Sequence, residues 1–208
     1  MGGPEYRFLT RWRIFGTTGE VSKVLENPGD LSRWWPAFCL AAEELSPGDE
    51  RGVGRRVRLR TKGWLPYGLD WELRVTESRH PFGFSLEARG DLEGTGVWTF
   101  EPAGAWTLAT CDWRVRAERP LWRALSPLLR PAFEADHRWA MRTGERSLAL
   151  EIERRRAKTP AERARMPAPP APASSLPWAV AGALGVVAAF GLGRALSRRR
   201  RKRRFRRR

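Results

Sequence analysis

Apolar and polar residues alternate along six segments of the first 117 residues. Within residues 69–75, for example, Trp71 and Leu73 alternate with Glu72 and Arg74. A period of two is typical of a strand with one buried face and one face in water. The predicted strands are residues 6–14, 55–61, 69–75, 82–89, 92–101 and 106–117. Because each of them has a polar face, the pattern predicts an antiparallel sheet that is covered on one side only.

The last predicted strand changes face part-way along. Its first inward residues are Trp106 and Leu108, whereas Trp113 and Val115 are the apolar positions further on. Such a switch predicts a β-bulge, here near residues 110–112. Asp112 is then the acidic residue expected to turn toward the buried face, and the alternative is a solvent-facing aspartate at the bulge.

The cover for the sheet follows it in the sequence. Pro131 suits the first turn of a helix, and an apolar stripe with helical spacing follows it. The stripe consists of Phe133, His137, Ala140, Met141, Gly144, Leu148 and Ile152. Two shorter helices are expected at residues 20–25 and 30–35, between the first two strands. The predicted fold class is therefore α+β, with an antiparallel sheet followed by one long helix.

The net charge of +16 belongs mostly to the C-terminal quarter of the chain. Residues 1–156 hold 25 Lys and Arg against 22 Asp and Glu, whereas residues 157–208 hold 14 basic residues and one acidic residue. Residues 157–175 are rich in Pro and Ala and read as a semi-extended linker. The predicted globular domain, residues 1–156, is nearly neutral, so the basicity says little about its ligand.

Residues 176–196 are apolar, with Arg194 as the single charged residue. A helix of this length would extend about 31 Å, close to the hydrocarbon thickness of a bilayer. We therefore expect a single membrane-spanning helix whose lipid-contacting residues include Trp178, Val186, Val187, Phe190 and Arg194.

Ten of the twelve residues in the final segment, 197–208, are basic. Beside an apolar span, anionic lipid headgroups are the most economical partner for such a segment. Nucleic acid is the alternative, but Phe205 is the only aromatic residue among the basic ones. The positive-inside rule would place the Arg-rich end in the cytoplasm and therefore the domain on the other side of the membrane. No signal peptide is visible that would export the domain, and this favours a domain that faces the cytoplasm.

Four stretches of the domain carry a family resemblance. They are WRIFGTTGEV at residues 12–21, LSRWWP at 31–36, GDLEGTGVW at 90–98 and HRWAM at 137–141. With the order of predicted elements, they make residues 6–156 similar to the START-like superfamily, also called SRPBCC or polyketide cyclase/dehydrase-like. The resemblance implies a helix-grip fold, in which a curved sheet wraps the long helix around an apolar cavity. It also implies a hydrophobic ligand such as a lipid, sterol, quinone or polyketide, and in some members a cyclase or dehydratase activity.

The aromatic residues are the candidate ligand-binding residues. Alternation places several tryptophans inward, and Trp34 and Trp35 accompany the short helices that flank the cavity mouth in the family. The predicted ligand-binding residues are Trp12, Trp34, Trp35, Trp71, Phe84, Trp98, Trp113, Phe133, His137 and Met141. The alternative for each tryptophan is that it fills the core.

The candidate catalytic residues are His137 and Asp112. A histidine on the apolar stripe could act as an acid or base near neutral pH, with Asp112 as its partner. The alternative is a core histidine with satisfied hydrogen bonds. Cys39 and Cys111 have no metal-binding spacing and read as two buried thiols rather than a disulfide, and we expect neither a metal nor a cofactor.

The sequence thus predicts a membrane-tethered domain that binds a hydrophobic small molecule. Two alternatives stay open: a cyclase- or dehydratase-type enzyme, and an adaptor that binds polyanions through its basic tail.

Overall fold

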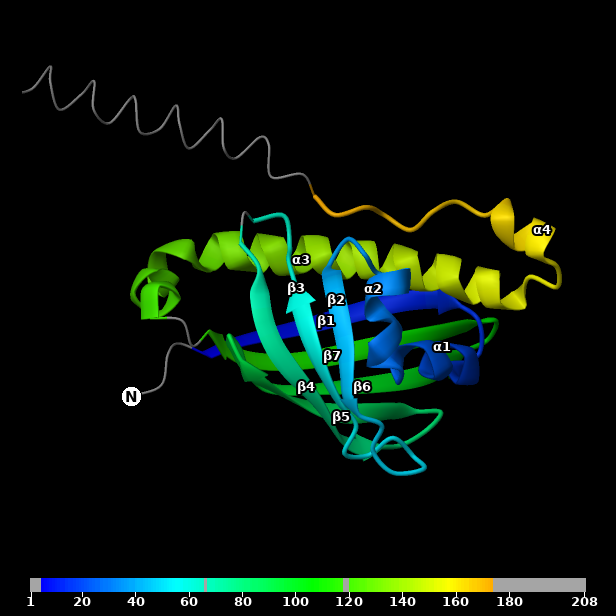
Figure 1. The fold of residues 1–208 in the computed structure, drawn as a ribbon, viewed down its shortest axis with the longest axis horizontal. Helices are drawn as coiled ribbons and strands as arrows, with labels where there is room; N and C mark the ends of the chain where they lie inside the picture. Colours follow the sequence, from blue (N-terminus) through cyan, green and yellow to red (C-terminus); the bar gives the residue numbers. More distant parts are fainter. Residues whose placement is uncertain (1–4, 66, 118–119, 174–208) are drawn as a thin grey trace, which may run out of the picture. The chain divides into compact units, whose positions relative to one another are not determined.

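The computed structural model describes residues 5–65, 67–117 and 120–173. Two α-helices and a 3-10 turn separate the first two strands, and the long helix follows the last strand (Figure 1). The strands are β1 (Glu5–Phe15), β2 (Cys39–Ser46), β3 (Arg56–Thr61), β4 (Leu69–Ser78), β5 (Gly83–Gly90), β6 (Leu92–Ala103) and β7 (Trp106–Ala117). The helices are α1 (Thr18–Leu25), η1 (Pro28–Asp30), α2 (Leu31–Trp34), α3 (Pro120–Arg156) and α4 (Pro160–Ala164).

The strands form one antiparallel sheet in the order β1-β7-β6-β5-β4-β3-β2. The sheet curves, and α3 runs along one of its faces (Figure 1). This arrangement confirms the predicted sheet with a long helix after it. Strand β2 was not predicted, because its exposed and buried residues do not alternate: most positions of this edge strand are exposed or half-buried.

The core lies between the inner face of the sheet and α3. Strand β3 shows the alternation plainly, since Val57 and Leu59 are fully buried between exposed arginines. On α3, Leu148 and Ile152 are also fully buried, which confirms the predicted apolar stripe. Pro131 is not the start of the helix, however: α3 begins at Pro120, and Pro131 lies inside it.

Strand β7 runs without the predicted bulge. Its register with both β1 and β6 is continuous, and Thr107, Ala109 and Cys111 face the core. Trp106 and Leu108 therefore point outward, the opposite of the prediction. On the outer face, the Trp106 ring packs against the ring of Phe15, with 5.2 Å between the centroids. An apolar side chain at this position therefore does not identify the buried face of the strand.

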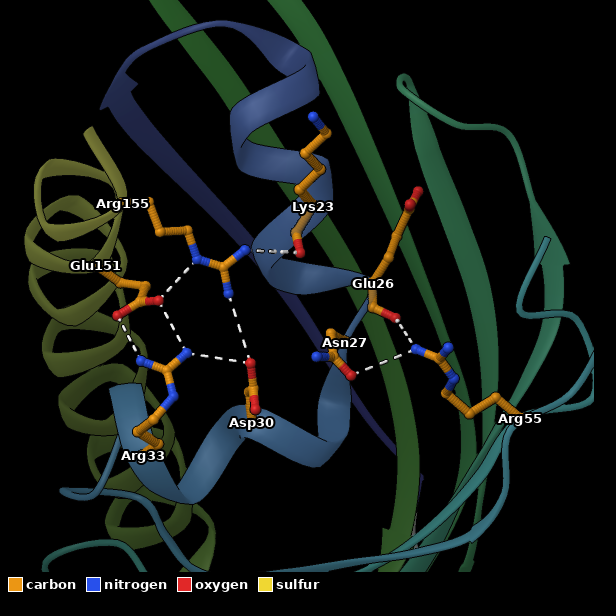
Figure 2. A network of polar contacts seen from close by, with 8 residues as sticks. All are labelled: Lys23, Glu26, Asn27, Asp30, Arg33, Arg55, Glu151 and Arg155. Carbon is orange, nitrogen blue, oxygen red and sulfur yellow. Dashed lines mark hydrogen bonds and ion pairs between the residues drawn. The ribbon is translucent and has the colours of Figure 1, made fainter. Parts of the chain in front are cut away.

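A polar network fastens α1 and α2 to the C-terminal part of α3 (Figure 2). The buried Glu151 carboxylate accepts two hydrogen bonds of 2.9 Å from Arg33 and one of 2.7 Å from Arg155. Arg155 also donates to the Lys23 carbonyl at 3.2 Å, and Arg33 to Asp30 at 3.1 Å. Buried charges need such partners, because an unpaired carboxylate in the core is costly.

The Glu151 network matters for the site because the segment it holds also walls the cavity described below. On the far side of the same segment, the Arg55 guanidinium donates to the Glu26 carbonyl at 3.0 Å and to Asn27 Oδ1 at 3.4 Å (Figure 2). Residues 25–31 are therefore tied to α3 on one side and to the sheet on the other.

The predicted linker contains a short helix. Helix α4 starts with a capping box, in which Thr159 Oγ1 accepts the Glu162 N–H and the Glu162 carboxylate accepts the Thr159 N–H. This T-P-A-E signal for a helix start is present in the sequence, inside a stretch that reads as a linker by composition.

In the part of the chain that the structure describes, none of the helices combines the length and apolarity needed to cross a bilayer. The predicted span at 176–196, with Trp178, Val186, Val187, Phe190 and Arg194, lies outside the described residues, as does the basic segment 197–208.

Candidate functional site

A cavity of about 220 Å³ lies between the inner face of the sheet and α3. Most of its lining is apolar, and eight of the ten predicted ligand-binding residues contribute to it. They are Trp35, Trp71, Phe84, Trp98, Trp113, Phe133, His137 and Met141. Alternation along the strands and helical spacing on α3 therefore identified eight side chains that line the same cavity.

The other two predicted residues, Trp12 and Trp34, do not line the cavity. Both are essentially inaccessible, at 1% and 0% exposure. The ring of Trp12 packs 5.8 Å from that of Trp35, and Trp34 stacks on Trp35 at 5.6 Å. They form a second layer that supports the cavity wall, which corresponds to the core-filling alternative.

Trp35 is held in the wall on two sides. Its Nε1 donates to Thr143 Oγ1 at 3.1 Å, and its ring occupies the space where a side chain at Gly144 would lie. Gly144 thus serves helix packing: α3 has no side chain where the Trp35 ring, at the end of α2, packs against it.

His137 faces the cavity from α3. Its ring stacks on Phe8 with centroids 4.1 Å apart, and its Nε2 lies 3.3 Å from Thr10 Oγ1. Burial, reinforced by the nearby Arg138 charge, lowers the pKa of His137 to about 4. The imidazole is therefore neutral at pH 7, and its Nε2 can form a hydrogen bond either with Thr10 or with a ligand.

Asp112 lies on the opposite face of the sheet from His137, so its predicted inward orientation is wrong. Its carboxylate pairs with Arg7 at 2.9 Å and with Arg114 at 3.1 Å on the outer surface. Hydrogen bonds from these two guanidinium groups hold the pKa of Asp112 below its ordinary value. The physical reason is the continuous register of β7, which turns every even-numbered residue near Asp112 outward. No acid–base pair forms between Asp112 and His137.

Sequence reasoning missed the polar residues at the Tyr6 end of the cavity. Tyr6, Tyr67 and Asp136 all contribute to the lining. Asp136 Oδ1 accepts the Leu65 N–H at 3.0 Å, so this side chain ties the β3–β4 loop to α3. Burial raises the pKa of Asp136 and, together with the Asp136 charge, that of Tyr67.

The signals for these three residues differ. Tyr6 lies on the inward face predicted for β1, so alternation could have selected it. Tyr67 sits in a loop, where no periodicity exists, and Asp136 binds loop backbone that only the tertiary structure brings near. Cys111, which also lines the cavity, and Cys39 are both buried free thiols, as predicted.

The polar groups of the lining are few, and Tyr6, Tyr67 and Asp136 gather at one end of it. Asp91, between β5 and β6, also contributes to the lining, and its carboxylate accepts the Asp70 N–H at 2.9 Å, which connects it to the start of β4. Among the described side chains, no three His, Cys, Asp or Glu residues gather in a way that could hold a metal ion. Chemically, the arrangement can enclose an apolar molecule and offer it a hydrogen bond from neutral His137.

No protein-family model and no curated protein matches the sequence. Solved structures do match. The Zhui aromatase/cyclase from Streptomyces superposes with a TM-score of 0.59 at 17% identity, covering 74% of this chain and 98% of that one. A START superfamily protein from Mycobacterium smegmatis gives 0.54 at 12% identity, covering 71% and 97%. A protein from Thermus thermophilus gives 0.55 at 15% identity, covering 70% and 97%. At these identities the likeness concerns the fold, and it confirms that this chain has the START-like helix-grip fold.

Proposed function

We propose that this protein binds a hydrophobic small molecule, such as a lipid, quinone or polyketide-like compound, in the cavity between the sheet and α3. The observation that carries the proposal is the cavity itself: about 220 Å³ of mostly apolar space between the sheet and α3, walled largely by aromatic rings. Packed interiors leave few voids larger than a water molecule, so an apolar space of this size favours a ligand.

The dimensions and lining restrict the ligand. The volume is below the range of about 300–1,000 Å³ typical of sites for drug-sized molecules. A compact ring system, or one end of a longer chain, suits it. Flat aromatic walls favour a planar or flexible apolar group, and a hydrogen bond at neutral His137 suits a carbonyl or hydroxyl on the ligand.

We further propose that the protein is held at a membrane by residues 176–208. The support is in the sequence, where an apolar segment of bilayer length precedes ten basic residues. Tethering would raise the effective concentration of the domain near lipid-soluble compounds, which suits a carrier or chaperone. The domain would face the cytoplasm.

Native mass spectrometry of the full-length chain in detergent tests ligand binding. We expect an apolar adduct on the wild type and its loss in Leu73→Phe, which enlarges a lining residue of β4. Val75→Leu is the matched control, because it overpacks the same strand outside the lining. An adduct that persists equally in both variants, or a wild type that never carries or takes up one, would overturn the proposal.

An enzyme of the cyclase or dehydratase type is the second candidate, favoured by the position of His137 on the cavity beside Thr10. In a dehydration, neutral His137 would take the proton next to a ligand carbonyl and then give it to the departing β-hydroxyl, which leaves as water. A pKa of about 4 makes His137 a weak base at neutral pH, which favours binding over catalysis. The discriminating assay is turnover of a bound β-hydroxy ketone by the wild type and by His137→Gln, followed as loss of water.

A further inference from the structure

An apolar corner stands out on the surface at the end of the domain where β1 ends and β7 begins. Phe15 is 53% exposed and Trp106 is 36% exposed. The turn that leads into Trp106, residues 102–105, reads Pro-Ala-Gly-Ala and is also exposed. We call Phe15 and residues 102–106 the aromatic corner. It holds six neighbouring residues without a charge, whereas much of the outer sheet face carries charged side chains.

The aromatic corner is rigidly built. Phe15 and Trp106 are opposite each other in the β1–β7 register, and their rings meet edge to face at 5.2 Å. Behind them the Gly16 N–H donates to the Ala105 carbonyl at 3.0 Å, and the buried Thr107 hydroxyl donates to the Gly16 carbonyl at 2.7 Å. Large exposed aromatic rings held in this way are typical of a contact surface.

Two guanidinium groups contact the rings of the corner. The guanidinium of Arg13 lies 4.6 Å from the Trp106 ring centre, and that of Arg156 lies 5.4 Å from the Phe15 ring centre. Arg156 is paired with Glu20, the Glu145 carboxylate accepts the Arg13 N–H at 2.9 Å, and Glu101 adds a further acidic group near the turn. Residues 154–165, from the last turn of α3 to just beyond α4, have six basic residues and one acidic residue, Glu162. Figure 1 shows the end of α3 at the same end of the domain as the β6–β7 turn.

We propose that the aromatic corner docks onto the surface of an anionic lipid bilayer. Tryptophan and phenylalanine flanked by arginine match the two layers of a membrane interface, because the rings enter the headgroup–acyl boundary while the guanidinium groups stay with the phosphates. One feature favours an anionic bilayer over a protein partner: the excess of basic residues in 154–165, at the same end of the domain as the corner (Figure 1).

This contact is distinct from the cavity. Tyr6, which lines the cavity, and Phe15 stand at opposite ends of β1, and no residue of the aromatic corner lines the cavity. We therefore expect substitutions in the aromatic corner to weaken membrane contact and to leave ligand binding in the cavity unchanged.

The experiment places an environment-sensitive thiol probe on the full-length chain at Ala105→Cys, in the exposed turn. Glu50→Cys, in the exposed β2–β3 connection, is the matched control site, and the buried Cys39 and Cys111 are protected from labelling. Labelled proteins are reconstituted into vesicles of phosphatidylcholine alone or with phosphatidylserine, and quenching by nitroxide-bearing lipids is measured.

We expect blue-shifted, strongly quenched emission from the probe at position 105 with anionic vesicles, and aqueous emission at position 50. Adding Phe15→Ser and Trp106→Ser should reduce the quenching at 105 severalfold, while the adduct seen by native mass spectrometry is unchanged. An aqueous signal at 105 while the protein sediments with vesicles would mean that the tail alone binds, and would overturn the proposal. A blue shift that needs no vesicles and grows with protein concentration would assign the corner to self-association and overturn it as well.

Discussion

The imidazole of His137 lies nearly parallel to the phenyl ring of Phe8, with 18° between the planes and 4.1 Å between the centroids. This stack joins α3 to β1, the strand at one edge of the sheet. It also fixes the direction of Nε2, which points at Thr10. The His137 side chain thus forms part of the cavity wall and supplies one of its hydrogen-bonding groups.

Replacing His137 should change how stability depends on pH. Its pKa is about 4 in the folded protein and near the ordinary value of 6.5 in the unfolded chain. Between these values the unfolded chain binds a proton that the folded protein does not, so stability falls as the pH drops through this window. The expected loss is about 2 kcal/mol at pH 5 relative to pH 7. Urea unfolding of His137→Gln at the two pH values should show a decrease smaller by that amount, and an unchanged decrease would contradict the assignment.

Asp112→Asn should leave the cavity untouched. The carboxylate lies on the outer face with Arg7 and Arg114, where exposed ion pairs contribute little to stability. We expect ligand binding, and any turnover, to match the wild type, with a small shift in thermal midpoint. A loss of turnover comparable to that of His137→Gln would show instead that the two residues act together.

Gly144→Ala should destabilise the protein, against the usual preference of helices for alanine. A Cβ at this position would lie 2.5 Å from the Trp35 ring, so α2 or the ring must move. Overpacking of this kind costs about 1–3 kcal/mol, more than the gain of about 1 kcal/mol from helix propensity.

The matched control for Gly144→Ala is Gly19→Ala in α1. A Cβ there meets nothing closer than Thr17 Oγ1 at 4.0 Å, so it should be neutral or stabilising. Thermal unfolding and ligand binding of the two variants separate the contact with Trp35 from a general effect of alanine. Equal midpoints would contradict the packing argument.

Glu151→Gln should loosen the attachment of α1 and α2 to α3. Gln keeps the shape of the side chain but removes the charge that faces Arg33 and Arg155. We expect a loss of about 2 kcal/mol, less than the full penalty for a buried pair, because both arginines reach solvent. Backbone hydrogen exchange should become faster in α1 and α2. The control is Asp30→Asn, at the exposed rim of the network, which should have a smaller effect.

The same network predicts acid sensitivity. Burial raises the pKa of Glu151, but the hydrogen bonds from Arg33 and Arg155 lower it more, and the net direction is down. Its contribution to stability is therefore present above the ordinary pKa of a glutamate and is lost as the pH falls below it. In acid unfolding, the stability of Glu151→Gln should depend less on pH in that range than the stability of the wild type. Identical pH dependence in the two proteins would show that Glu151 is not the group responsible.

The local pattern of residues was enough to find most of the fold. Alternation identified β4 and β3 because each has one face in water, and helical spacing identified the buried face of α3 through Leu148 and Ile152. Where burial does not alternate, as in β2, the pattern carried no signal. Where an apolar side chain lies outside, as Trp106 does against Phe15, the pattern pointed to the wrong face.

The sequence by itself determined the sheet, the long helix, the aromatic composition of the cavity and the near-neutral charge of the domain, because these follow from which residues can be buried. Only the tertiary structure decided that Asp112 is on the outer surface, that Trp12 and Trp34 support the wall without lining it, and that Asp136 holds the β3–β4 loop. These depend on strand register and on contacts between residues as far apart as Leu65 and Asp136, and no local pattern of apolar and polar positions records such pairings.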